Sequence, residues 1–316
     1  MMTYSKLRTN PKQFLAMTSL TVTEFDKLCL AFQAEYEKKY PAHLTEDGRP
    51  RQRGVGGGRT GQLNSIEEKL LFILTYHKTY PTQTVQGQLF GLSQSHAHEW
   101  IHRLMPLLQN ALTRLGYSPT RDPQAVQKYH TVEQSAPLLL IDGTERRRQR
   151  PKQAAKQRDF YSGKKKAHTE KNLMLGDEQT HQVAYLSATY GGRLHDKSIA
   201  DQESIRYPPH TTLTKDTGFQ GYEPAGVHTI QPQKQMRGQW LSAVDRVANR
   251  LIAQARIVME HILAGVKRCR IVKDVLRMTT EGISDLVMAI ACGLHNLRND
   301  FRRLASPKYR LNSYFR

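Results

Sequence analysis

Residues 136–143 have the sequence APLLLIDG, a short apolar run that ends in an acid and a glycine. An apolar run of this length, bounded by turn residues, is typical of a strand buried within a sheet. The segment KNLMLGDEQTHQVAYLSATYGG at 171–192 predicts two strands around an Asp177-Glu178 turn. TTLTKDTG at 211–218 predicts a further strand, which also ends in an acid and a glycine turn. These strands mark the beginning of a domain that contains a sheet.

Helical periodicity follows the strands, over about 240–268 and 283–304. Strands followed by long C-terminal helices predict a mixed α/β domain over 130–305. In the first of these helices, one face collects apolar side chains that we expect to pack on the sheet, namely Val244, Leu251, Val258 and Ile262. The opposite side carries a narrow polar stripe of Asn249, Arg256, Glu260 and Lys267.

The residues before the strands predict helices. Thr21 and Glu24 have the spacing of a capping box for a helix over 21–39. Ser65 can cap a second helix, which ends before Pro81. A short helix, a GLS turn and the segment SQSHAHEWIHRLMPLL then fit a helix-turn-helix.

The second helix of this motif has two distinct faces. The core-facing side chains are expected to be Ala97, Trp100, Ile101 and Leu104. The outward-facing ones are Gln94, Ser95, His98 and His102, where a recognition helix meets base edges or phosphates. A three-helix bundle that never contacts DNA gives the same pattern, so both interpretations stay open.

We therefore expect five segments along the chain. They are an N-terminal helical segment (1–40), a basic Gly/Pro-rich linker (41–62), a helix-turn-helix domain (63–122), the α/β domain (130–305) and a basic C-terminal tail (306–316). The glycines of the linker lack the spacing of a phosphate-binding loop.

The chain is strongly basic. Its 316 residues include 47 Lys and Arg against 28 Asp and Glu, a formal net charge of +19. A field of this size attracts polyanions, and the absence of a long basic amphipathic helix favours nucleic acid over a membrane surface.

Composition excludes several classes of protein. With 38% hydrophobic residues, the chain is not a low-complexity disordered segment. No apolar run approaches the roughly 18 residues of a membrane-spanning helix, and MMTYSKLRTNPKQF at the N-terminus is not expected to be a secretory signal. The three cysteines lie far apart without CxxC spacing, which argues for a reducing compartment and against a disulfide framework or a zinc knuckle.

Three acids could perform chemistry. Asp142 and Asp216 each close an expected strand, and α/β folds bind ligands at strand ends. Glu260 lies in the narrow polar stripe, bordered by Ile257 and Leu263. Carboxylates that converge from separate elements can hold Mg²⁺, and two ions about 4 Å apart can drive phosphoryl transfer.

Each acid also has a plainer interpretation. Asp142 and Asp216 can be ordinary turn residues, and Glu260 can form an i,i+4 surface pair with Arg256. Asp196 is a rival second acid, but its position before a helical run suggests an N-cap. The 13 histidines include no HExxH spacing, which argues against a zinc hydrolase.

Five motifs occur together in the second half of the chain. They are IDGTERR (141–147), YSGKKKAHTEKN (161–172), GGRLHDKSI (191–199), LTKDTGFQGY (213–222) and ARIVMEHILAGVKRCRI (255–271). With the helix-turn-helix segment before them, they resemble the DDE-type transposases of bacterial insertion sequences, in the group similar to PIF/Harbinger elements. The resemblance covers about residues 65–303.

The resemblance implies a ribonuclease-H-like catalytic domain preceded by the helix-turn-helix. It also implies two Mg²⁺ ions, for which Mn²⁺ can substitute, with Asp142 bridging both ions while Asp216 and Glu260 each hold mainly one. The implied reaction is cleavage at the ends of an insertion sequence, followed by strand transfer into target DNA. The implied partners are double-stranded DNA, both terminal inverted repeats and target, and further copies of the chain. No membrane is involved, and the implied location is the bacterial cytoplasm, at the nucleoid.

The family carries a Tyr-Arg-Glu-Lys signature around its glutamate. Arg256, Glu260 and Lys267 match it, whereas Ala253 stands at the tyrosine position. Arg256 and Lys267 are expected to grip phosphates near the site. The other expected DNA contacts are Arg146, Arg147, Lys164 and Lys165 along the backbone, and Gln94, Ser95 and His98 in the helix-turn-helix. Two alternatives to an active transposase remain, namely an inactive or domesticated DNA-binding relative and a related nuclease without strand transfer.

Overall fold

The structure is a computed structural model that describes residues 1–44, 48–51, 61–129, 136–234 and 240–305. Much of the expected linker and the whole tail 306–316 therefore lie outside the described residues. The chain divides into two compact units. The first comprises 1–118, 268–272 and 286–301, and the second comprises 119–267, 273–285 and 302–316.

The first unit is helical. Its helices are α1 (Tyr4–Arg8), α2 (Pro11–Thr18), α3 (Val22–Lys39), α4 (Ile66–Thr79), α5 (Gln83–Phe90) and α6 (Gln94–Arg114), with parts of α10 (Arg270–Lys273) and α11 (Ile283–Ala305). The capping box before α3 is confirmed, since the Glu24 N–H donates to Thr21 Oγ1 and the Thr21 N–H donates to Glu24 Oε2. Ser65 caps α4 by accepting the Glu68 N–H, as predicted.

Helices α5 and α6 form the predicted helix-turn-helix. Ser93 caps α6 by accepting the His96 N–H at 3.2 Å. Ala97, Ile101 and Leu104 have no exposed surface, as expected for core positions. Trp100 differs from the prediction because it is only half-buried, with its ring beneath the cations of Lys69 and Arg103.

The C-terminal helix completes the core of this first unit. Gly293 lies against Leu112 of α6, and Asn296 Nδ2 donates to the Tyr117 carbonyl at 2.9 Å. Arg298 is buried and donates to Ser19 Oγ at 2.8 Å. The expected segmentation grouped residues 286–301 with the strands. The structure packs them with the N-terminal helices instead, because the apolar face of α11 is buried there.

The second unit contains a mixed sheet. Its strands are β1 (Leu138–Arg147), β2 (Tyr161–Ser162), β3 (Ala167–Asp177), β4 (Val183–Leu186), β5 (Tyr190–Gly191), β6 (Thr212–Thr214) and β7 (His228–Ile230). They follow the order β2-β3-β1-β6-β7, and β4 and β5 also pair with β3. Strand β1 is antiparallel to β3 but parallel to β6, which is parallel to β7. Together with its flanking helices, this mixed sheet confirms the predicted α/β fold and is consistent with a ribonuclease-H-like domain.

Helices cover both faces of the sheet. Leu139, Ile141 and Leu175 share one cluster with Ile199 of α8 (Asp196–Glu203). On the other face, α9 (Ala243–Val266) buries Met259, Ile262 and Val266, with Ile262 against Gly176 of β3.

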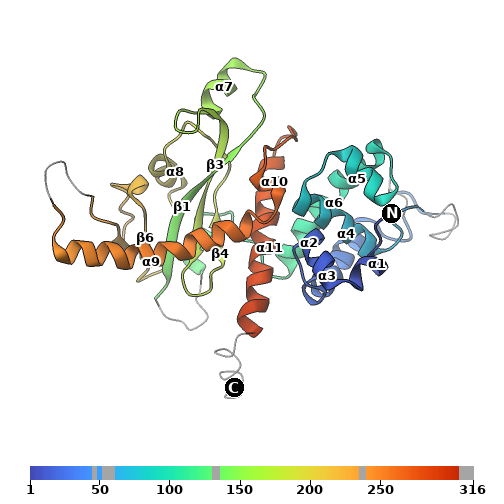
Figure 1. Ribbon diagram of the computed structural model, residues 1–316, viewed down its shortest axis with the longest axis horizontal. Coiled ribbons are helices and arrows are strands. Elements are labelled where there is room, and N and C mark those ends of the chain that lie inside the picture. The colour runs from blue at the N-terminus through green and yellow to red at the C-terminus, as the bar shows by residue number, and fades with distance from the viewer. Residues whose placement is uncertain (45–47, 52–60, 130–135, 235–239, 306–316) are drawn as a thin grey trace. The chain divides into compact units, whose positions relative to one another are not determined.

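Only part of the face predicted for α9 packs on the sheet. Ile262 is buried as expected, whereas Val244 is 77% exposed and Leu251 is 61% exposed. The prediction for those two residues is wrong because the first turns of α9 project past the strands labelled in Figure 1.

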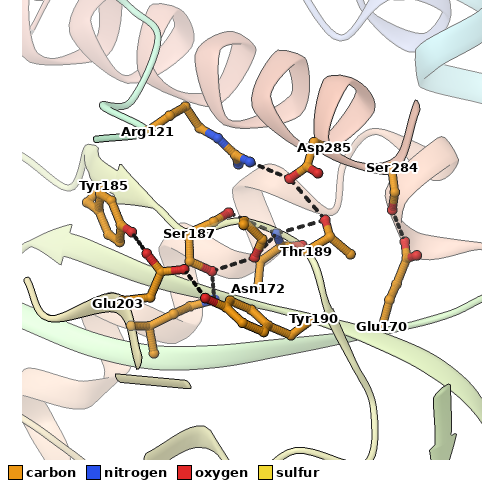
Figure 2. A network of polar contacts seen from close by, with 12 residues as sticks. Arg121, Glu170, Asn172, Tyr185, Ser187, Thr189, Tyr190, Glu203, Ser284 and Asp285 are labelled. Carbon is orange, nitrogen blue, oxygen red and sulfur yellow. Dashed lines mark hydrogen bonds and ion pairs between the residues drawn. The ribbon is translucent and has the colours of Figure 1, made fainter. Parts of the chain in front are cut away.

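A polar network connects the sheet to the beginning of α11 within the second unit (Figure 2). Asp285 accepts from Arg121 and from Thr189, and Ser284 donates to the buried Glu170. Tyr185 and Tyr190 both donate to Glu203 at the end of α8. These bonds link β3, β4 and β5 to α8 and to the beginning of α11.

Cys29, Cys269 and Cys292 are free. Within the described ranges, every helix is too short or too polar to cross a bilayer.

Candidate active site

Asp142 lies within β1 and not at its end, which corrects the expected strand boundary. The antiparallel pairing with β3 continues to Arg147, whereas the parallel pairing with β6 stops at Leu140. Asp142 is therefore half-buried just beyond the last β6 pair, and its Oδ1 accepts the N–H of Gly143 at 2.7 Å. Asp142 and Asp216 thus each lie just beyond the last paired residues of β1 and β6, Leu140 and Thr214.

Asp216 follows β6, as predicted. Its Oδ1 accepts the Gly218 N–H at 2.7 Å, so Asp216 caps the short helix η2 (Thr217–Phe219). Asp216 is therefore a turn residue, as its plainer interpretation held. Its negative charge also acts on Asp142, as expected for two acids that lie near each other.

Asp196 is a third acid at this point. It was expected to be an N-cap, but His195 occupies the cap position and Asp196 is the first residue of α8. A Cβ on Gly143 would lie only 2.7 Å from Asp196 Oδ1, so the glycine permits this close approach. Lys171 Nζ lies 3.1 Å from the same oxygen. Sequence reasoning missed Lys171, for which the only signal is its place in the strand opposite Asp142.

The electrostatics of Asp142 reflect this crowding. Burial, followed by the negative charges of Asp216 and Asp196, raises the pKa of Asp142 to about 6. The Gly143 N–H and Arg256 oppose the increase. A carboxylate in this position holds its proton unusually tightly unless a cation compensates it.

Helix α9 brings cations to the acids. Arg256 Nη2 lies 3.6 Å from Asp216 Oδ2, so it pairs with a different element and not with Glu260 one turn along. Lys267 is half-buried, and burial lowers its pKa while the charge of Asp142 opposes that decrease. Arg256 and Lys267 thus border the acids from one helix.

Glu260 lies on the same helix line, between Arg256 and Lys267, and its side chain is exposed. Of the three predicted acids, the structure brings Asp142 and Asp216 together, with Asp196 beside them. In the part of the chain that the structure describes, no three His, Cys, Asp or Glu side chains are grouped closely enough to hold a metal ion.

Two family models match this chain. One is described as a DDE superfamily endonuclease and matches residues 141–296, which include Asp142, Asp216 and Glu260. The other is described as the helix-turn-helix of DDE superfamily endonuclease and matches residues 61–114. The chain belongs to the DDE superfamily endonucleases. The DDE domain thus begins in β1 and extends into α11.

Two curated relatives share most of their length with it. The chain is 26% identical over 213 residues to the "Probable transposase for insertion sequence element IS702" of Microchaete diplosiphon, covering 67% of this chain and 73% of that protein. It is 24% identical over 250 residues to the "Putative transposase for insertion sequence element IS112" of Streptomyces albus G, covering 78% and 86%. No solved structure matches the chain.

The basic residues expected to contact DNA have different surroundings in the DDE domain. Arg146 is buried and lies 3.1 Å from Glu170, so the expectation that it tracks DNA is corrected. Its side chain points inward because β1 continues as a strand beyond Asp142. Arg147, Lys164 and Lys165 are exposed, as a DNA contact requires.

The expected DNA-reading residues of α6 are also exposed. Gln94 Nε2 donates to Gln83 Oε1 at 2.9 Å, and a ring nitrogen of His98 lies 3.0 Å from Gln83 Nε2. Ser95 is exposed beside them. One side chain of α5 thus orients two of the three residues at the start of α6.

The chemistry of the acids in the DDE domain fits a divalent cation. Carboxylate oxygens are the ligands that Mg²⁺ and Mn²⁺ prefer. Burial, together with the negative charges of Asp216 and Asp196, raises the pKa of Asp142, and a divalent cation would relieve this charge imbalance. Asp216 and Asp196 are each compensated here by a single cationic side chain.

Proposed function

We propose that the protein is a transposase that cuts DNA at the ends of an insertion sequence and transfers the cut strand into target DNA. The supporting observation is that Asp142 and Asp216, from two parallel neighbouring strands, lie close enough to perturb each other, with two cations of α9 beside them. Membership of a DDE endonuclease family already indicates phosphoryl transfer.

In this proposal Asp142, Asp216 and Glu260 hold two Mg²⁺ or Mn²⁺ ions. When bound, such ions would lower the pKa of the attacking water or hydroxyl group and neutralise charge on the phosphate. Asp142 would be the ligand that both ions share, since it is largely buried and the charges of both Asp216 and Asp196 act on it. Glu260 lies on the same side of α9 as Arg256 and Lys267. Arg256 pairs with Asp216, and Lys267 interacts electrostatically with Asp142.

The chain's own cations position the DNA. Arg256 is held by Asp216, and a guanidinium in that place can bind a phosphate with two parallel hydrogen bonds. Lys267 is partly desolvated, which strengthens its attraction to an anionic phosphate. Arg147, Lys164 and Lys165 extend this positive surface along the DNA backbone, without reading sequence.

Recognition of the element ends is assigned to the helix-turn-helix. Gln94, Ser95 and His98 stand at the N-terminal end of α6, the part of a recognition helix that contacts base edges. Strand transfer joins both ends of one element to the target DNA, so we propose that two or more copies of the chain assemble on DNA.

The decisive experiment is cleavage of a plasmid that carries the reading frame with its native flanking DNA. Asp142→Asn, Asp216→Asn and Glu260→Gln should each abolish Mg²⁺-dependent nicking while binding to the flanks persists. Asp201→Asn is the matched control, because Asp201 is an exposed acid paired with Lys197 on α8, and it should cut normally. Nicking by the triple variant would refute the assignment.

A second candidate is a protein that binds DNA without cutting it. The observation in its favour is the exposed position of Glu260, outside the group formed by the other acids. Under this alternative, the purified protein binds the terminal repeats and never nicks them with Mg²⁺ or Mn²⁺. A related nuclease would nick but fail to join pre-cleaved ends to target DNA.

A further inference from the structure

The connection between β1 and β3 is the most basic segment of the second unit. Residues 148–166 contain eight Lys and Arg and one acid, Asp159. The segment includes α7 (Ala154–Phe160), which Figure 1 shows beyond the ends of β1 and β3. A solvated surface would normally mix both signs of charge.

A surface basin of about 900 Å³ lies beside α7. Three arginines line it, Arg150, Arg158 and Arg193, together with the rings of Tyr161 and His168. Among its described lining residues none is acidic. The basin therefore combines concentrated positive charge with an aromatic surface.

A close approach of two backbone segments builds the basin. A Cβ on Gly191 would lie 2.3 Å from the carbonyl oxygen of Asp159, so only glycine lets β5 lie against the end of α7. The Arg193 N–H then donates to the same oxygen at 3.2 Å. This brings Arg193, from a segment distant in sequence, to the side of Arg158.

The remaining groups are held in place. Arg150 Nη2 donates to Gln157 Oε1 at 2.9 Å, and Gln157 Nε2 donates to the Pro151 carbonyl at 2.8 Å. Tyr161 pairs with His168 across β2 and β3, and the two rings meet edge to face at 5.6 Å. Tyr161 nevertheless remains 45% exposed.

These features select one class of ligand. Cationic side chains alone are sufficient to bind the phosphate backbone of a duplex, whose bases are stacked and inaccessible. A half-exposed aromatic ring among cations instead suits a base whose face is free, with phosphates on either side. We infer that the basin binds an unpaired nucleotide of single-stranded DNA. Tyr161 stacks on its base, while Arg150, Arg158 and Arg193 hold the adjoining phosphates.

This inference rests on the proposed function only for the identity of its ligand, DNA. An unpaired nucleotide arises where a strand is opened or cut, so the basin would retain a strand that has been opened or cut. Because the binding is independent of the acids, it can be measured in EDTA, where no metal-dependent cleavage takes place.

The test uses the full chain and a fluorescein-labelled 20-base oligothymidine, compared with a duplex of equal length. Tyr161→Ala should weaken single-strand binding about tenfold and leave duplex binding within about twofold. Tyr161→Phe keeps the ring and should bind as the natural chain does. Arg158→Gln and Arg193→Gln should each make the salt dependence of single-strand binding shallower, whereas the exposed Arg206→Gln control should not.

A second readout detects stacking directly. An oligonucleotide with one 2-aminopurine should lose fluorescence on binding to the natural chain and to Tyr161→Phe, but not to Tyr161→Ala. Equal loss of single-strand and duplex affinity in Tyr161→Ala, or quenching that persists without the ring, would overturn the inference. If the natural chain binds single-stranded DNA in this way but never nicks the plasmid with Mg²⁺ or Mn²⁺, the result counts against the proposed function and not against this inference.

Discussion

His77 of α4 has no exposed surface, and neither ring nitrogen has a hydrogen-bond partner among the described residues. Burial lowers its pKa from 6.5 to about 3. At pH values between about 3 and 6.5, His77 is therefore protonated in the unfolded chain but not in the folded chain. The free energy of unfolding should consequently fall as the pH falls below 6.5.

The size of this effect follows from the pKa difference. Each pKa unit corresponds to about 1.4 kcal/mol, so lowering the pH from 7 to 5 should remove about 2 kcal/mol of stability through His77 alone. His77→Leu removes the titrating group and two buried unpaired nitrogens without opening a large cavity. The variant should be at least as stable as the natural chain at pH 7.

The assay is urea unfolding at pH 7 and pH 5, followed by tryptophan fluorescence. The chain has two tryptophans, so a Trp240→Phe background leaves Trp100 to report on the first unit. His77→Leu should lose about 2 kcal/mol less stability between the two pH values than the background does. His96→Gln, at an exposed position, is the control and should titrate like the background. Identical losses in His77→Leu and the background would show that the reasoning about burial is wrong.

Three further predictions concern the second unit. Asp196→Asn should weaken Mn²⁺ binding, measured by electron paramagnetic resonance, and slow nicking by about 10- to 100-fold; unchanged values would place Asp196 outside the metal site. Glu170→Gln should lower the free energy of unfolding by about 3–5 kcal/mol, because it leaves the buried Arg146 uncompensated. The double change Arg146→Met with Glu170→Leu should restore most of the lost stability. Additive losses from the two changes in chemical denaturation would contradict a buried pair. Arg256→Gln should slow nicking and reduce the salt slope of DNA binding by about one, and an unaltered slope would mean that Arg256 stays with Asp216.

Local patterns in the sequence were sufficient for much of the fold. The capping box at Thr21, the Ser65 cap of α4 and the hairpin turn at Asp177 depend on residues a few positions apart, and all three are present. Asp142 and Asp216 could be expected near each other because each follows the last pair of two parallel strands.

The failures share a physical cause, since each depends on contacts between segments far apart in sequence. Asp196 joins the other acids because Gly143 leaves room for it, and no local pattern encodes that. Arg146 is buried because β3 pairs with β1 far beyond the apolar run. Val244 is apolar yet exposed because the sheet ends before α9 does.

The helical unit includes residues 286–301, which follow its N-terminal part, residues 1–118, by well over a hundred positions. On the ribosome, the helix-turn-helix is therefore synthesised early but lacks part of its interior until translation is nearly finished. A prematurely terminated product would carry the recognition helix on an incomplete scaffold. Only a molecule with its DDE segment already made can hold that helix firmly, so under the proposed function aborted fragments would compete poorly for the element's ends.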